Sequence, residues 1–169
     1  MNIISTPRLE LIALSASQLE LCTQDIPTLE RQIGIRIDRD FITERVQRAL
    51  RMKIAKMKNA DDAQHAWLTY WLLVVREEKI GAGMLGYKGY PNEAGTTEIG
   101  YGIAPAYQGK GLMGEAVQAL VNWAFTHPFC RTVTASEVEN PASRRLLEKL
   151  GAELVEQTPS STSWKFQKK

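Results

Sequence analysis

The sequence predicts an α/β (α+β) fold in which helices cover both faces of a mixed, mostly antiparallel central sheet. Two observations support this prediction. Three apolar stretches between residues 67 and 104 are separated only by short polar turns, and strands joined in this way pair antiparallel. An amphipathic helix and a further apolar strand follow them, and a crossover of helix length favours parallel pairing of the strands that it joins.

The first 60 residues are expected to form a strand and two helical segments. Residues 6–14 alternate apolar and polar side chains, and Ser15 is placed to cap a short helix that ends near Cys22. A second helix is expected over residues 38–59, where apolar side chains recur at spacings of three and four. They are Ile42, Val46, Ala49, Leu50, Ile54 and Met57.

The rest of this second helix carries basic side chains. Charges of one sign on a helix form either a solvated face or a surface that attracts an acidic partner, and the sequence leaves both interpretations open. The basic residues are Arg45, Arg48, Arg51, Lys53, Lys56 and Lys58.

Turns and caps delimit the remaining elements. The three strands are expected over residues 67–75, 80–90 and 96–104, with the central helix ending near His127 and Pro128. Asn140 is placed to cap a later helix, which Pro141 suits at its first turn and Gly151 closes. The chain continues with a strand over 132–138, this helix over 140–151, and a closing hairpin of strands over 152–157 and 163–168.

Length and composition predict a single domain that covers residues 1–169. With 44% hydrophobic and 24% charged residues, the chain has the composition of an ordinary soluble protein. A formal net charge of +2 is too small to indicate nucleic acid as a partner by itself. No apolar run of 18 residues and no leader are found, so a membrane association is not expected and the predicted location is cytoplasmic.

The two cysteines give no sign of metal binding. Cys22 and Cys130 lie far apart in the sequence, and neither has metal-ligand spacing with His65 or His127. Buried or idle thiols are therefore expected, and the sequence predicts no metal site.

A glycine-rich turn is the strongest functional signal in the chain. The strand that begins at Thr96 stops at Pro105, and Gly109, Gly111 and Gly114 then open a helix with a continuous apolar stripe. Glycines at a helix N-terminus expose backbone N–H groups that bind anions, which favours a phosphate ligand. The stripe consists of Met113, Val117, Leu120, Val121 and Ala124.

The same turn reads literally as G-x-G-x-x-G, the fingerprint of a dinucleotide fold. Glu137 stands at the end of the next strand, where that fold places its ribose-binding acid. Against this interpretation, residues 105–108 separate the apolar strand from the first glycine, which in the fingerprint follows the strand directly. The strand–helix–strand unit also begins about a hundred residues into the chain, whereas the fingerprint belongs to a parallel sheet.

Residues 108–113, Gln-Gly-Lys-Gly-Leu-Met, resemble the Q/R-x-x-G-x-G/A signature of the GNAT superfamily of N-acetyltransferases. Residues 98–101 and 114–116 resemble its Rim-type branch (ribosomal-protein/N-terminal acetyltransferase-like), which acetylates protein N-termini and small amines. Met113 departs from the signature, since Gly or Ala is usual there. Residues 140–151 resemble the family's N-x-x-[AS]-x-x-L-[YL]-x-K-x-G pattern, so the resemblance extends over roughly residues 8–151.

The resemblance implies one N-acetyltransferase (GNAT) domain that uses acetyl-CoA as co-substrate without a metal. A primary amine, of a protein N-terminal residue or a small molecule, would attack the thioester directly. The segment after the first strand would wall the acceptor site. The implied cofactor-binding residues are Tyr101, Ile103, Gln108, Gly109, Lys110, Gly111, Leu112, Met113, Gly114, Asn140 and Ser143, with Lys110, Arg144 or Arg145 on the ribose phosphate.

The resemblance also suggests catalytic residues. Glu98 is the expected general base, directly or through a water, and Glu137 is a second candidate. Leu147 stands where many family members carry a tyrosine that protonates the leaving thiolate. Ser143 is therefore the expected proton donor, and Tyr101 and Tyr107 are alternatives.

The sequence leaves two other classes of function open. A non-catalytic acyl-CoA-binding module is compatible with the departures at Met113 and Leu147, and a Rossmann-type NAD(P)-dependent oxidoreductase with the literal G-x-G-x-x-G. The amine acceptor is not identified by any motif. A homodimer is compatible with the sequence, and neither a membrane nor nucleic acid is an expected partner.

Overall fold

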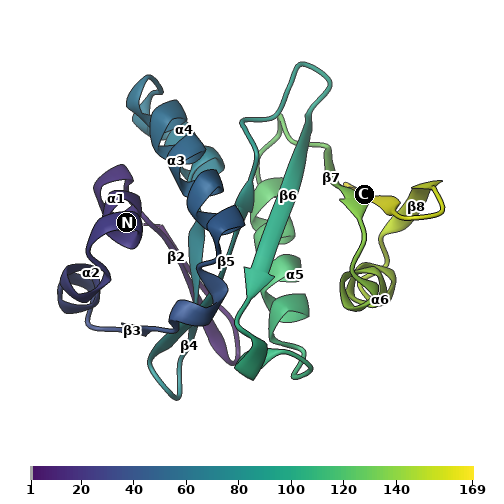
Figure 1. Cartoon of the computed structure of the whole chain (residues 1–169). Coiled ribbons are helices and arrows are strands. Elements are labelled where there is room, and N and C mark those ends of the chain that lie inside the picture. Colours follow the sequence, from purple (N-terminus) through teal and green to yellow (C-terminus); the bar gives the residue numbers. More distant parts are fainter. Residues whose placement is uncertain (1) are drawn as a thin grey trace.

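The computed structural model describes residues 2–169 (Figure 1). Within them the strands form one sheet in the order β1-β2-β4-β5-β6-β7-β9-β8, and β3 pairs with β5 beside that path. The strands are β1 Ile3–Ser5, β2 Leu9–Ala13, β3 Arg36–Ile37, β4 Trp71–Val75, β5 Ile80–Tyr87, β6 Thr96–Ile103, β7 Thr132–Val138, β8 Glu153–Gln157 and β9 Thr162–Gln167. The helices are α1 Ala16–Gln24, α2 Ile26–Ile33, α3 Glu44–Lys58, α4 Asp62–Leu68, α5 Leu112–Phe125 and α6 Pro141–Lys149, with 3₁₀ turns η1 Arg39–Phe41 and η2 Pro105–Tyr107.

The pairing confirms the predicted fold class. Among the described strands only β3–β5 and β6–β7 pair in parallel, and all other neighbours are antiparallel. A doubly wound dinucleotide fold needs a mostly parallel sheet, so this topology excludes the Rossmann interpretation of the glycine turn. The parallel β6–β7 pair is the one that the helix-length crossover predicts.

Successive residues of β6 point to opposite faces of the sheet, one covered by α5 and the other next to α3. Tyr87 and its cross-strand partner Ile99 point toward α5, where the Tyr87 hydroxyl donates to the Leu120 carbonyl at 2.8 Å. Gly86 and its partner Gly100 point the other way, because a Cβ on Gly86 would meet the Tyr70 ring on the side of α3. Figure 1 shows α5 lying behind β6. The predicted apolar stripe of α5 is fully buried in this layer.

Two expected boundaries are wrong for local reasons. Trp67 and Leu68 belong to α4 and not to a strand, because the Thr69 N–H closes a helical turn on the His65 carbonyl at 2.9 Å. The helix expected from residue 38 begins at Glu44 instead, since Thr43 caps it by accepting the Val46 N–H at 3.3 Å. The short elements β1, β3 and α2 were not predicted from the sequence, and β5 ends three residues earlier than expected.

The sheet splits between its two parallel strands. β6 and β7 pair only over residues 96–98 and 132–134, and Figure 1 shows the strands diverging beyond them. Past Glu98, the β7-facing edge of β6 therefore has no strand partner. β7 continues into a bulge between Ala135 and Val138, where Glu137 adopts a φ of 52°. The glycine turn and α6 lie beyond the diverging ends of these strands.

Candidate functional site

The glycine turn begins where β6 leaves the sheet. The Ala104 N–H still bonds the Ala82 carbonyl at 2.8 Å, and one 3₁₀ turn follows. Gly109 and Gly111 both have a φ of 75°, in the left-handed region that costs other residues about 1–2 kcal/mol. A Cβ on Gly109 would meet no atom within 4 Å, so the turn has open space beside its backbone. The turn thus offers exposed backbone to a ligand.

The N-terminus of α5 supplies unpaired donors to this turn. Gly111 is the N-cap and provides no side-chain oxygen, and the first intrahelical bond runs from the Glu115 N–H to the Gly111 carbonyl. The N–H groups of residues 112–114 therefore have no partner in the helix. Donors arranged in this way attract phosphate. The Gln108 N–H is already bonded to the Pro105 carbonyl, which leaves Gln108 its side chain for a ligand.

The hairpin turn between β1 and β2 braces the glycine turn. Glu115 in the first turn of α5 accepts hydrogen bonds from the Thr6 hydroxyl at 2.6 Å and from Arg8 Nε at 2.6 Å. Arg8 also donates to the Lys110 carbonyl at 2.9 Å. Burial alone would raise the pKa of Glu115, but the bonds from Thr6 and Arg8 together hold it below its usual value. Sequence reasoning did not find this brace, because its residues lie about a hundred positions apart.

Tyr101 and Ser143 come together across the split. The Tyr101 hydroxyl is enclosed and has no hydrogen-bond partner within the described chain, although Ser143 lies beside it. Burial raises the pKa of Tyr101, and the neighbouring Ser143 offsets part of that rise. Asn140 caps α6 as predicted, accepting the Ala142 N–H at 2.8 Å. A protonated phenol without a partner is a candidate proton donor.

The two departures from the family pattern are core residues. Met113 and Leu147 are both buried, so neither side chain fills the glycine turn. Gly114 lies at the contact between α5 and α6, where a Cβ would approach Leu146 at 3.9 Å. Met113 therefore leaves the backbone donors of residues 109–114 free to face a ligand.

Glu98 lies on the opposite face of β6 from Tyr101. It shares that face with Gly100 and Gly102, where an added Cβ would meet no atom within 4 Å. Its carboxylate forms an ion pair with the ammonium of Lys88, which follows β5. The predicted base therefore lies on the same face of β6 as this open space, and the predicted proton donor Ser143 lies beside Tyr101 toward the other face.

Lys53 is a buried charge that the sequence analysis placed on the basic face. Only 8% of this residue is exposed, and its Nζ donates to the Tyr87 carbonyl at 2.7 Å and lies 4.4 Å from the Tyr70 ring centroid. Burial, together with the nearby charges of Lys56 and Lys88, lowers the pKa of Lys53 to about 7. The sequence does contain a signal for this burial, because Lys53 falls at helical spacing between the buried residues Leu50 and Met57.

Apart from the buried Tyr107, the other candidates lie at the surface. Glu137 is exposed in the β7 bulge, and its N–H bonds the Ser163 hydroxyl at 3.1 Å. Lys110 places its Nζ 5.2 Å from the ring centroid of Tyr107, whose hydroxyl donates to Glu78. Arg144 and Arg145 are exposed on α6. Within residues 2–169, no hydrogen bond joins Tyr107 or Glu137 to Tyr101 or Ser143.

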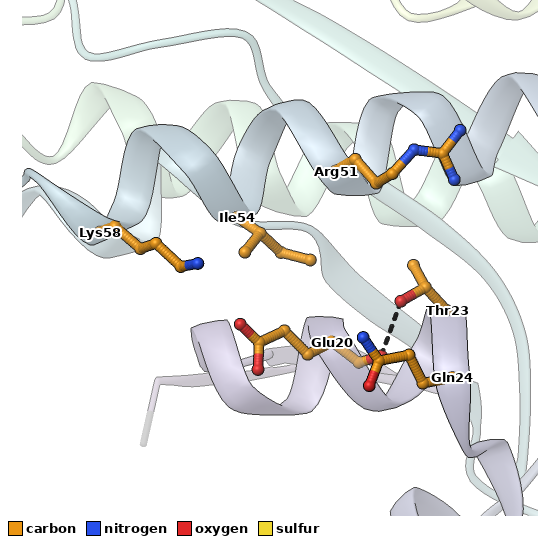
Figure 2. Close-up of a pocket in the computed structure, with 6 residues that line it drawn as sticks. All are labelled: Glu20, Thr23, Gln24, Arg51, Ile54 and Lys58. Atoms are coloured by element: carbon orange, nitrogen blue, oxygen red, sulfur yellow. Dashed lines mark hydrogen bonds between the residues drawn. The ribbon is translucent and has the colours of Figure 1, made fainter.

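A cavity of about 410 Å³ opens elsewhere, between α1 and α3. Figure 2 shows residues of both helices facing it, among them Glu20, Arg51 and Lys58. It lies on the α1 edge of α3, away from β5 and β6. Over residues 2–169, no group of three or more His, Cys, Asp or Glu is placed to hold a metal ion. The same part of the chain contains no helix long and apolar enough to cross a membrane.

Comparison with known proteins identifies a family. Residues 11–153 match the family model described as the acetyltransferase (GNAT) domain. The chain is 34% identical over 95 residues to the uncharacterized N-acetyltransferase YjdG of Bacillus subtilis (strain 168), covering 56% of each. It is 35% identical over 79 residues to the uncharacterized N-acetyltransferase p20 of Bacillus licheniformis, covering 46% of this chain and 44% of that protein. The matches thus span about half the length of these curated relatives.

Solved structures share the fold over nearly the whole chain. A GNAT-family acetyltransferase from Bacillus anthracis superposes with a TM-score of 0.62 at 20% identity, covering 99% of both chains. RimL, a ribosomal L7/L12 alpha-N-protein acetyltransferase in complex with coenzyme A, gives 0.66 at 19% identity, covering 98% of both. An acetyltransferase from Salmonella typhimurium that modifies the N-terminal serine of the same ribosomal protein gives 0.65 at 18% identity, covering 98% of this chain and 99% of that one.

Proposed function

Since this chain belongs to the acetyltransferase (GNAT) family, we propose that it transfers an acetyl group from acetyl-CoA to a primary amine. One observation carries the proposal: the unpaired N–H groups of residues 112–114 face a glycine turn directly beside the free edge of β6. A pyrophosphate fits such a turn, and an extended pantetheine chain fits an unpaired strand edge. The proposal treats residues 1–169 as one catalytic domain with a cytoplasmic location.

The chain's own backbone would hold the coenzyme. Residues 109–114 would bind the pyrophosphate, and the N–H and C=O groups of Tyr101 and Ile103 would bind the pantetheine as a neighbouring strand would. The open space beside Gly109 leaves room for phosphate oxygens. Lys110 is exposed just before α5, and Arg144 and Arg145 are exposed in the middle of α6, so their charges would be available for the ribose phosphate.

Glu98 and the Tyr101–Ser143 pair approach β6 from opposite faces, so a thioester held at the free edge between them would have a candidate base on one side and a candidate acid on the other. When bound, the coenzyme supplies an activated acetyl thioester. Glu98 would take a proton from the acceptor ammonium, directly or through a water, and Ser143 with Tyr101 would protonate the leaving sulfur. An α-amino group titrates near 7.7–8.0 and a lysine amine near 10.4, so a carboxylate base favours a protein N-terminus as the acceptor.

The structural relatives support a peptide acceptor over a small amine. RimL and the Salmonella typhimurium protein are named for acetylating a ribosomal protein at its N-terminus. Both are less than 20% identical to this chain, so their structural similarity establishes a shared fold and no more. A polypeptide N-terminus is accordingly part of the proposal, and a homodimer stays a prediction from the sequence.

A thermal-shift experiment tests the coenzyme assignment. Acetyl-CoA, free CoA, NADPH and ATP are compared side by side, and a ligand at 100 times its dissociation constant should stabilise the fold by about 2.7 kcal/mol. We expect stabilisation by acetyl-CoA and CoA, followed by thiol release when an amine acceptor is added. Stabilisation by NADPH without a response to acetyl-CoA would contradict the proposal.

The Glu98→Gln variant separates an enzyme from a non-catalytic acyl-CoA-binding module. We expect it to keep acetyl-CoA binding and to lose turnover, because the amide cannot accept the proton. Lys88→Gln is the matched control for the ion pair: it removes the partner charge and leaves the base in place. If wild-type protein binds acetyl-CoA but releases no thiol with any amine, the binding module is the correct interpretation.

A further inference from the structure

The two edges of α3 carry basic side chains toward different surroundings. On one edge, Lys53 Nζ bonds the Tyr87 carbonyl at 2.7 Å and Lys56 Nζ bonds the Lys88 carbonyl at 3.0 Å, so this edge lies along the end of β5. On the other edge, Arg51 and Lys58 line the cavity that faces α1 (Figure 2). The same helix therefore offers a basic edge to β5 and a second one to α1.

Arg45 belongs to the edge that faces β5. It is close enough to Tyr70 for its charge to act against the rise that burial causes in the pKa of that residue. The Tyr70 ring also lies beneath Lys53 Nζ and beside Gly86. Arg45, Lys53 and Lys56 thus follow one another along the side of α3 that borders the sheet.

The β6 half of the sheet face next to this basic edge is an open strip at Gly100 and Gly102, whereas Met84 and Gly86 of β5 on the same face are buried. Gly86 pairs with Gly100, and the face that they share is the one on which Tyr70 and α3 lie. Gly100 and Gly102 have no atom within 4 Å of an added Cβ, so there is open space above the β6 floor of this strip. Glu98 and its partner Lys88 stand at one end of it. We call the space between this floor and the α3 edge the α3–β6 groove.

The α3–β6 groove carries an excess of positive charge. Within residues 2–169, the ion pair of the groove is Lys88 with Glu98, while Arg45 and Lys56 are exposed and form no ion pair. Met52 projects from the same edge with 62% of its surface exposed. An ammonium approaching these cations is repelled unless its own molecule brings negative charge.

The length of the basic edge indicates the size of the acceptor. Arg45 and Lys56 are 11 residues apart on α3, which corresponds to about 16 Å at 1.5 Å per residue. An extended peptide covers that length with about five residues at roughly 3.3 Å each, whereas a free amino acid covers one residue's length. The groove therefore matches a polypeptide segment better than a small amine.

We propose that the acceptor is an acidic polypeptide N-terminus, with its amine at Glu98 and carboxylates within its first five residues on Lys56 and Arg45. The proposal rests on the acetyl transfer proposed above and adds the charge of the acceptor to it. The exposed Met52 side chain lies between the two cations and offers an apolar contact to the bound segment. Salt weakens the attraction, because the two cations are exposed.

Two peptides of equal length test the charge of the acceptor. Both begin with serine, and residues 2–5 are acidic in one and lysine in the other. Thiol release from acetyl-CoA should give a kcat/KM at least about 10-fold higher for the acidic peptide at 50 mM salt, and a smaller ratio at 500 mM. Equal kcat/KM values for the two peptides would overturn the proposal, and so would a faster reaction with free aspartate or glutamate.

Charge reversal on the two edges of α3 tests the location. Arg45→Glu and Lys56→Glu should each raise the KM for the acidic peptide about 10-fold and leave the KM for acetyl-CoA unchanged. Arg51→Glu is the control, because it makes the same charge change on the edge that faces α1. An equal effect of Arg51→Glu would show that net charge alone is responsible and would overturn the placement of the acceptor in the α3–β6 groove. Absence of any thiol release, together with no stabilisation by acetyl-CoA, would instead contradict the proposed acetyl transfer.

Discussion

The two faces of β6 are built for recognition in different ways. On the α5 side, the glycine turn offers backbone groups next to the free, β7-facing edge of β6, and the side chains of Arg8 and Glu115 only brace the turn. Toward α3, Gly100 and Gly102 remove side chains from the floor, and charged groups stand around it. A backbone site suits a ligand that never changes, such as a coenzyme, and a side-chain groove suits a partner that differs from one relative to the next.

The largest effect is expected at Gly111, on the backbone face. Gly111→Val places a branched side chain at a φ of 75° in the turn and should weaken acetyl-CoA binding about 100-fold, equivalent to about 2.7 kcal/mol. Titration calorimetry measures the change. Gly34→Val is the matched control, because Gly34 has a φ of 71° at the end of α2, outside the proposed site. Equal loss of acetyl-CoA affinity in both variants would mean that backbone strain, and not the turn, is responsible.

A smaller effect is expected at Gly100, on the side-chain face. Gly100→Val fills the floor of the α3–β6 groove and should raise the acceptor KM about 30-fold without changing the affinity for acetyl-CoA, because the new atoms meet open space. Steady-state kinetics with the acceptor varied measures this change. Gly89→Val also enters open space but lies outside the groove, and it should behave as wild type. Loss of acetyl-CoA binding in Gly100→Val would show that the two faces are not separate.

The next largest effect is expected at Arg8, which braces the glycine turn. Arg8→Met removes the side-chain donors of Arg8 to Glu115 and to the Lys110 carbonyl. It should raise the KM for acetyl-CoA about 10-fold with little change in kcat, since Arg8 positions the turn without touching the reacting atoms. Arg8→Lys should restore part of the affinity. Arg76→Met is the control, because Arg76 bonds the Thr6 carbonyl in the same hairpin but does not reach the glycine turn. A fall in kcat with an unchanged KM would contradict a positioning role.

The smallest effect concerns stability and pH at Lys53. Its folded-state pKa is about 7 and its ordinary value is 10.5, so the unfolded chain binds this proton more readily between those pH values. The free energy of unfolding should therefore rise with pH above 7, by about 1 kcal/mol between pH 7 and 8. Lys56 and Lys88 are the cations that face Lys53, and Glu98 pairs with Lys88.

Urea denaturation of Lys53→Met at a series of pH values measures this contribution. The variant should lose the Lys53 part of the slope, whereas Lys58→Met, on the α1 edge of the same helix, should keep it. An unchanged slope in Lys53→Met would mean that Lys53 titrates near its ordinary pKa when folded.

The same difference between the faces explains what the sequence could predict. The glycine turn, the stripe of α5 and the Asn140 cap are local patterns, and their positions were predicted correctly. Glycine spacing alone did not distinguish two phosphate-binding folds, and the antiparallel pairing around β5 made that decision. The α3–β6 groove, in contrast, brings together residues of α3, of β6 and of the segment after β5, so no short sequence motif predicts it.

Two predictions were wrong because packing in the folded chain overrode a local pattern. Trp67 was assigned to a strand because an apolar run fits a buried strand or a buried helix equally well. The structure places it in α4, where its ring centroid lies 4.6 Å from that of Trp123, and this tertiary packing decides between the two states. Lys53 was assigned to the charged face because residue type outweighed its position between two buried neighbours.

The most direct test of the division between the two faces is amide hydrogen exchange with and without acetyl-CoA. Protection on adding acetyl-CoA should appear in residues 100–103 and 108–114, where the free strand edge and the unpaired helix N–H groups lie. Residues 44–58 of α3 should remain unchanged until an acceptor peptide is added. Protection by acetyl-CoA confined to α1 and α3, around the cavity of Figure 2, with none in the glycine turn, would contradict the account.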